Sequence, residues 1–139
     1  MQITAKELAE FTKETLLAIV TTTNTDGSPQ ATPVWYDYDG EYFIFTSHSG
    51  RVKVRNLMRD PRVSLVVVDT SGHGTPLVVS GTAEIVAEGA EEATERMAIR
   101  YEGRERGQAT ARRLAEYARG IGRHRVTVRI GPERVIYGE

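Results

Sequence analysis

The stretch that decides the fold is residues 16–46, LLAIVTTTNTDGSPQATPVWYDYDGEYFIFT. It opens with an apolar, β-branched run over 16–23, which is short for a helix and typical of a buried strand. The turn residues NTDGSP follow, and 30–38 is again rich in Thr, Val, Trp and Tyr. An Asp-Gly pair at 39–40 is a tight hairpin signal that leads into 41–46. The stretch therefore predicts three successive antiparallel strands.

Three further segments have the character of strands. Residues 63–68 and 77–86 are mostly apolar and are separated by a turn-rich segment at 71–76, and 125–130 alternates in polarity. Pro132 predicts that the residues after it form only an edge or a tail. Six strands without a βαβ rhythm predict a mainly β fold, a six-stranded antiparallel barrel.

Two short helices are expected outside the predicted barrel. Thr4-Ala-Lys-Glu7 has the pattern of a capping box and predicts a helix at the start of the chain. Residues 51–59 predict a second helix, with Ser47 or Ser49 as the N-cap and Asp60-Pro61 as the stop.

Between residues 88 and 122 the apolar period changes from 2 to 3.6. This change predicts two helices inserted before the last strand. A chain of 139 residues is of ordinary size for one domain and buries roughly 65–70% of its unfolded surface. We therefore expect a single domain over 1–139 with a helical insertion at about 88–122.

The composition excludes several classes of protein. The chain has no cysteine, so disulfides, thiolate metal sites and cysteine nucleophiles are excluded. It has no apolar run of transmembrane length and no visible signal peptide, so we expect a cytoplasmic protein without membrane contact. The net charge of −1 argues against a nucleic-acid partner, and the basic residues are not interleaved with aromatic ones.

The near-neutral charge conceals two basic clusters. Residues 51–62 contain five basic side chains and one acidic one, and 112–129 contains six and one. Two basic patches on a neutral protein favour a compact anionic ligand over a long polyanion. The alternative is that both clusters are solvated faces of surface helices.

Catalysis by side chains alone has no support in the sequence. The chain lacks a complete dinucleotide fingerprint, a Walker motif and a nucleophile elbow. His48, His73 and His124 lie on separate loops or junctions without the spacing of a helical metal pair, so no metal site is expected. If the protein is an enzyme, a bound cofactor carries the chemistry.

Residues 46–56, TSHSGRVKVRN, have the features of a phosphate site. They end a strand, form a hydroxyl-rich turn and enter a helix, whose free N–H groups and dipole attract an anion. Arg51 and Lys53 add positive charge at that end, where cations oppose the dipole at a cost of about 0.3–1 kcal/mol each. A sequence that places cations there despite this cost is expected to use them to bind an anion.

Three segments in register resemble a known family. They are 26–35 (DGSPQATPVW), 46–61 with its Lys-x-Arg-Asn-Leu-x-x-Asp-Pro core, and 80–84 (SGTAE). The chain resembles the flavin and deazaflavin oxidoreductases of the pyridoxamine 5′-phosphate oxidase-like superfamily, and most closely the group that uses coenzyme F-420. The resemblance covers 8–86 well and 125–137 weakly.

The resemblance implies a homodimer of FMN-binding-like split β-barrels, with two cofactor clefts at the subunit interface. It places the cofactor phosphate at Arg51, Lys53 and Asn56, with Arg55 nearby. It places the flavin or deazaflavin ring beside Gln30, Thr32, Val34, Thr46 and Ser47. Trp35 and Tyr36 could line the substrate side, although buried aromatic residues on strands more often belong to the core.

Two departures from the family pattern bear on the substrate. Pyridoxamine phosphate oxidases carry a C-terminal Arg/Trp-rich segment that completes both sites, and this sequence lacks it, so oxidation of vitamin B6 is not expected. The insertion at Glu88–Gly122 is where such families vary, so the substrate cannot be inferred from the resemblance. The arginines of 112–125 could contact the acidic tail of a deazaflavin.

The favoured function is a coenzyme F-420-dependent oxidoreductase that transfers hydride between the reduced cofactor and a small unsaturated or quinone-like substrate. One alternative is an FMN-dependent oxidoreductase of the same fold, and another is a non-catalytic carrier of the cofactor. Both cofactors have a ribityl phosphate, so the phosphate site does not separate them. The second basic cluster favours F-420, whose oligoglutamate tail adds negative charges.

Overall fold

One antiparallel sheet organises the protein, in a computed structural model that describes residues 3–70 and 74–138. The described residues form seven strands in the order β2-β1-β5-β6-β7-β4-β3, and every neighbouring pair is antiparallel. The mainly β, antiparallel prediction is confirmed. The strands are β1 (Leu17–Thr23), β2 (Pro29–Trp35), β3 (Asp37–Tyr38), β4 (Phe43–His48), β5 (Arg62–Val68), β6 (Pro76–Val86) and β7 (Arg125–Tyr137).

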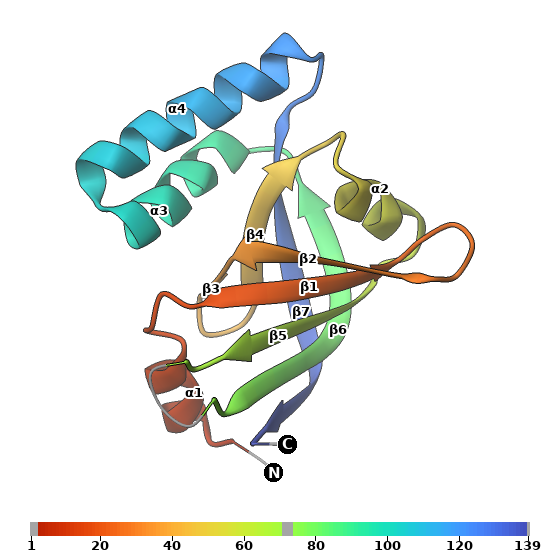
Figure 1. Cartoon of the computed structure of the whole chain (residues 1–139), viewed down its shortest axis with the longest axis vertical. Coiled ribbons are helices and arrows are strands. Elements are labelled where there is room, and N and C mark those ends of the chain that lie inside the picture. The colour runs from red at the N-terminus through yellow and green to blue at the C-terminus, as the bar shows by residue number, and fades with distance from the viewer. Residues whose placement is uncertain (1–2, 71–73, 139) are drawn as a thin grey trace.

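The sheet is strongly curled into a half-barrel, so that β2 from one end of the strand order approaches β4 near the other end (Figure 1). Alternate side chains of the strands point into the curl and form the core. Phe43 and Phe45 of β4 are completely buried there with Leu65 of β5 and Val79 of β6. This packing fixes the inner face of β4, one of the two strands that carry the candidate site.

The described residues also form four helices outside the sheet: α1 (Ala5–Phe11), α2 (Val52–Arg59), α3 (Ala90–Glu102) and α4 (Arg104–Gly120). The capping box of α1 is present, because the Thr4 hydroxyl accepts from the Glu7 amide while the Glu7 carboxylate accepts from the Thr4 amide. Helix α2 packs on β1 and β6. Helices α3 and α4 form a hairpin over one end of the sheet, where α3 contacts β4 and β7 (Figure 1).

The prediction of six strands is wrong because the predicted strand 30–38 is two strands. Tyr36 separates β2 from β3, its side chain is completely buried, and its amide donates to the Tyr101 hydroxyl at 3.1 Å instead of to a neighbouring strand. The following strand begins at Phe43, later than predicted. The Asp39 carboxylate accepts from the amides of Glu41 and Tyr42, which keeps these two residues in the turn.

The last strand is longer than predicted. β7 continues through Pro132 to Tyr137, and its second half pairs with β6 in register, with Leu77 opposite Tyr137. Pro132 has no amide to donate, and it lies opposite Gly81 beside a register shift in β6. A Cβ on Gly81 would meet the Gly131 carbonyl oxygen, so only glycine allows this close approach. Beyond Ile130, β7 pairs with β6 alone, so the prediction of an edge segment at 133–137 is confirmed, although this segment continues β7 and is not a separate tail.

Helix α2 begins without a side-chain cap. The predicted N-cap residues are wrong: Ser47 lies within β4, and the Ser49 hydroxyl accepts from the His124 amide at 3.2 Å. Arg51 occupies the N-cap position and makes no capping hydrogen bond with its side chain. The first amides of α2 are therefore not satisfied by a capping side chain.

The predicted turn at 71–76 lies partly outside the described residues, and His73 lies wholly outside them. Within the described ranges, no helix is long and apolar enough to cross a membrane.

Candidate functional site

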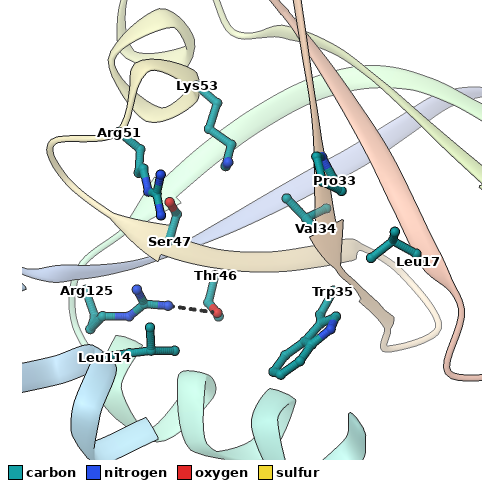
Figure 2. A pocket seen from close by; sticks show the side chains of 10 residues that line it. All are labelled: Leu17, Pro33, Val34, Trp35, Thr46, Ser47, Arg51, Lys53, Leu114 and Arg125. Carbon is teal, nitrogen blue, oxygen red and sulfur yellow. Dashed lines mark hydrogen bonds between the residues drawn. The ribbon is translucent and has the colours of Figure 1, made fainter. Parts of the chain in front are cut away.

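A cleft opens between the start of α2, the strands β2 and β4, and helix α4 (Figure 2). It consists of two adjacent hollows of about 380 and 590 Å³ that share Arg51 and Lys53 in their walls. The first hollow is lined by Leu17, Pro33, Val34, Trp35, Thr46, Ser47, Arg51, Lys53, Leu114 and Arg125. The second is lined by Gln30, Thr32, His48, Gly50, Arg51, Val52, Lys53, Arg113, Leu114 and Tyr117.

One end of the first hollow is cationic. Arg51, the N-cap residue of α2, and Lys53 in its first turn reach into it, and Arg125 reaches into it from the start of β7 (Figure 2). Lys53 is half-buried and donates to the Thr32 hydroxyl at 3.1 Å, and burial followed by the charge of Arg51 lowers its pKa. Among the described residues, no acidic side chain lines either hollow. The positive charge of this end is therefore uncompensated from within the cleft.

Arg125 is the most buried of these cations, with 6% of its surface exposed. Its guanidinium donates to two hydroxyls, from Nη2 to Thr46 at 3.2 Å and from Nε to Thr94 at 3.1 Å. Burial, followed by the charge of Arg51, lowers its pKa to about 10. It remains charged at neutral pH.

The other end of the first hollow is apolar. Val34 and Pro33 of β2, Leu17 of β1 and the ring of Trp35 form this wall (Figure 2). Figure 2 shows Arg51 and Lys53 on the opposite side from the Trp35 ring, with the hydroxyls of Thr46 and Ser47 between them. The cleft therefore suits a ligand that has an anionic group at one end and a flat, largely apolar ring system at the other.

His48 lies in the wall of the second hollow. It is buried, and its Nδ1 accepts a hydrogen bond from the Gly50 amide at 3.1 Å. Burial and then the surrounding cations lower its pKa, which favours the neutral ring. The cations are Arg51, Arg125, Arg123 and Lys53, in decreasing order of effect.

Seven of the nine candidate cofactor residues line this cleft. Val34, Thr46 and Ser47 belong to the first hollow and Gln30 and Thr32 to the second, while Arg51 and Lys53 belong to both.

Arg55 and Asn56 lie elsewhere, at a separate hollow of about 470 Å³ beside the β1–β2 turn. Asn56 is buried and donates to the side chains of Thr22 and Asn24 at 3.1 and 2.9 Å. The structure thus brings seven candidates together and separates these two.

The two aromatic residues left open by the sequence have different surroundings. Trp35 lines the cleft, whereas Tyr36 is completely buried in the core.

Sequence reasoning missed Arg125, Leu114 and Leu17 as cleft residues. Arg125 was visible only as one member of the second basic cluster. The available signal was its position at the start of a strand, directly after a predicted pair of helices. Such a helical hairpin can cover the first residues of the strand that follows it, and so enclose their side chains.

Comparison with protein-family models finds a match to the pyridoxamine 5′-phosphate oxidase model over residues 4–136. The chain belongs to the pyridoxamine 5′-phosphate oxidase-like family. This family binds flavin or deazaflavin, and most of its members are flavin-dependent oxidoreductases. The resemblance seen in the sequence is confirmed. A comparison with curated proteins finds no match.

Similar solved structures show the same fold. A conserved hypothetical protein from Mycobacterium tuberculosis is 27% identical with a TM-score of 0.78, covering 100% of this chain and 86% of that one. An F-420 reductase is 24% identical with a TM-score of 0.73, covering 91% and 94%. A pyridoxamine 5′-phosphate oxidase homologue from Listeria innocua is 16% identical with a TM-score of 0.67, covering 96% of each chain.

The residues of the cleft fit a cofactor of the kind that this pyridoxamine 5′-phosphate oxidase-like family binds. Three cations without an acidic partner in the cleft match a phosphate, and the apolar wall beside Trp35 matches a flavin-type ring. In the described part of the chain, no three His, Asp or Glu side chains gather in a metal-binding group. His48 and His124 line two different hollows.

Proposed function

We propose that the protein is an oxidoreductase that binds a phosphorylated flavin-type cofactor in this cleft. The observation that carries the proposal is the cationic end formed by Arg51, Lys53 and Arg125, which faces no carboxylate of the described residues in the cleft and lies opposite an apolar wall. A charge-rich pocket without counter-ions is stabilised when an anion enters it. When bound, the cofactor supplies hydride chemistry, and the protein supplies binding, orientation and exclusion of water.

In this proposal each element has a defined task. Arg51 and Lys53 hold the phosphate at the uncapped start of α2. Val34, Thr46 and Ser47 border the ring, with Gln30 and Thr32 on the side of the second hollow. Asn56 supports the site through the placement of α2, because it links this helix to the end of β1, and Arg55 lies beside it at the separate hollow.

We favour coenzyme F-420 over FMN as the cofactor. Arg113 of α4 lines the second hollow beside Arg51 and Lys53, so the positive surface continues beyond a single phosphate site. An acidic tail of several carboxylates would use this extension, whereas FMN would not. The fold shared with an F-420 reductase gives weak additional support. The substrate class that we propose is a small unsaturated or quinone-like molecule.

Titration of the purified protein with F-420, FMN and riboflavin tests this assignment. Charge-assisted hydrogen bonds contribute about 1.5–3 kcal/mol each, so Arg51→Ala or Lys53→Ala should weaken binding of either phosphorylated cofactor by roughly 10- to 150-fold. Riboflavin lacks the phosphate, and its affinity should stay the same. Arg104→Ala and Arg106→Ala, exposed residues of α4 that line neither hollow, are the matched controls.

Arg51 is exposed, so its replacement should change the free energy of unfolding by less than about 0.5 kcal/mol. Unchanged affinity for FMN and F-420 in both α2 variants would overturn the phosphate assignment. Tighter binding of FMN than of F-420 by the unmodified protein would make the FMN-dependent enzyme the better proposal.

A non-catalytic cofactor carrier is the second candidate function, because the same cleft serves it equally well. Turnover separates the two. The loaded protein should oxidise or reduce members of a panel of small quinones and unsaturated carbonyl compounds. Stoichiometric binding without turnover across reductants and acceptors would favour the carrier.

We further propose that the protein acts as a homodimer. Leu17 lines the first hollow yet is 57% exposed, and Val52 and Tyr117 line the second hollow yet are 49% and 58% exposed. A second copy of the chain that covers such apolar side chains would also close the cleft. Light scattering at micromolar concentration should give twice the chain mass, and a single 15.4 kDa species would contradict the dimer.

A further inference from the structure

Arg125 is a buried cation without a salt bridge to the described residues. The charge of Glu91 favours its protonated form, but Glu91 forms its own salt bridge with Arg119. Among the described residues, it forms no ion pair with any carboxylate, and 6% of its surface is exposed. Burial of a charge without a paired counter-ion costs free energy, so buried charges in proteins are usually paired. The free protein therefore carries an unfavourable feature at the wall of its cleft.

The Thr94 hydroxyl fixes the direction of this guanidinium. Thr94 lies on α3, is 2% exposed, and donates its own proton to the Ala90 carbonyl at 2.7 Å. Because that proton is engaged, the Thr94 oxygen can only accept, and it accepts from Arg125 Nε. This contact holds the inner edge of the guanidinium.

The outer edge of the guanidinium faces the cleft. Nη2 donates to the Thr46 hydroxyl, and Nη1 makes no hydrogen bond to the described residues although Arg125 lines the first hollow (Figure 2). The Thr46 hydroxyl accepts this bond and keeps its own proton available for donation. Arg125 and Thr46 together therefore offer donors toward the space that Arg51 and Lys53 also border.

We propose that Arg125 binds the same phosphate-type oxyanion as Arg51 and Lys53, and that Thr94 is its positioning residue. The inference rests on the proposed function, and it gives the α3–α4 insertion a part in cofactor affinity. The ligand class is an oxyanion that can accept from three cations at once. The two α2 residues approach it from one side and Arg125 from the other.

The test compares the phosphorylated cofactor that the unmodified protein binds more tightly, FMN or F-420, with riboflavin, using Arg125→Met, Thr94→Val and Thr94→Ser. The results expected for FMN hold equally for F-420. Arg125→Met keeps a long side chain and removes the charge, so FMN should bind roughly 10- to 150-fold more weakly while riboflavin affinity stays the same. Thr94→Val should weaken FMN binding about 10-fold, and Thr94→Ser, which keeps the hydroxyl, should restore it.

Stability of the free protein supplies an independent readout. A structural arginine destabilises the fold when it is removed, but removal of an uncompensated buried charge leaves the unfolding midpoint of the free protein unchanged or higher. We expect the second result for Arg125→Met. Arg112→Met is the matched control, because it makes the same charge change at an exposed position of α4 that lines neither hollow.

Each failure has its own signature. Loss of FMN affinity in Arg51→Ala with normal affinity in Arg125→Met would overturn this inference and leave the proposed function intact. Equal losses for FMN and riboflavin together with a lower unfolding midpoint would make Arg125 structural and also overturn it. Normal FMN affinity in Thr94→Val would remove the positioning role. If the unmodified protein binds neither FMN nor F-420, the proposed function itself fails.

Discussion

The indole of Trp35 stacks on the ring of Tyr101, with centroids 4.9 Å apart and planes inclined by 9°. Trp35 belongs to β2 and lines the cleft, whereas Tyr101 belongs to the inserted helix α3. The Tyr101 hydroxyl also accepts from the Tyr36 amide at 3.1 Å and donates to the Leu16 carbonyl at 2.5 Å. One residue of the insertion therefore holds the aromatic wall of the cleft in place.

Tyr101→Phe should lower the free energy of unfolding by about 1–3 kcal/mol. The stack remains, but the Tyr36 amide and the Leu16 carbonyl lose a partner in a partly buried place. Urea unfolding measures the change. Tyr36→Phe is the matched comparison, because the buried Tyr36 hydroxyl has no partner in the described structure, and its removal should leave stability unchanged or higher. Equal losses in both variants would contradict this account.

Gly107→Ala should destabilise the protein by about 1–3 kcal/mol through overpacking. A Cβ at this position of α4 would lie 2.5 Å from the Ile99 amide nitrogen, so α4 would have to move away from α3. Thermal unfolding measures the loss. Gly120→Ala, at the far end of the same helix, meets nothing within 4 Å and should raise stability by up to about 1 kcal/mol. A neutral Gly107→Ala would show that the two helices are not closely packed in solution.

His48 should make stability depend on pH. In the folded protein its pKa is lowered by burial and then by the nearby cations, whereas in the unfolded chain it has the ordinary value of about 6.5. The unfolded state therefore binds a proton more readily. The contribution of His48 to the free energy of unfolding is fully present above about pH 6.5 and is lost as the pH falls through the folded-state pKa.

Unfolding free energies measured between pH 5 and 8 test this expectation. His48→Gln keeps an acceptor for the Gly50 amide and should flatten the decline below about pH 6.5 relative to the unmodified protein. His124→Gln, at an exposed histidine, is the matched control. An identical decline in all three proteins would assign it to other groups.

Hydrogen exchange should show α4 opening more easily than the strands β1 and β5. The residues that α4 buries are small, namely Gly107, Thr110, Ala111, Ala115 and Ala118. Helix α3 should exchange more slowly than α4, because Arg100 donates to the carbonyls of Thr12 and Tyr36 and ties α3 to the rest of the fold. Protection of α4 equal to that of β5 would contradict the expectation that the insertion is a separable element.

The sheet was predictable where local chemistry determines it. The apolar runs at β1 and β5 and the Asp-Gly turn before β4 specify strands and a hairpin without help from the rest of the chain. The break at Tyr36 and the continuation through Pro132 were not predictable in this way. The first depends on the hydroxyl of Tyr101, and the second on Gly81 in another strand, so both follow from contacts between distant segments.

The residues of the candidate site also differ in how far local sequence predicts them. Arg51 and Lys53 were predictable because they stand at the start of a helix, where basic residues are locally unfavourable. Asn56, only a few positions further along α2, points instead to Thr22, because the helix turns it away from the cleft. The role of Arg125 depends on the hydroxyl of Thr94 in α3, and sequence spacing carries no sign of that pairing.

The place of β7 has a consequence for how the chain is made. β7 follows every other strand in sequence, yet it lies between β6 and β4 in the sheet. During synthesis, β1, β2, β5 and β6 can pair as soon as they emerge, and β3 can pair with the start of β4. The rest of β4, which includes Phe45, has no strand partner until residues 125–137 have been added. A nascent chain stalled within α4 would therefore display an unpaired strand edge and apolar rings, which are features that chaperones and aggregation both recognise.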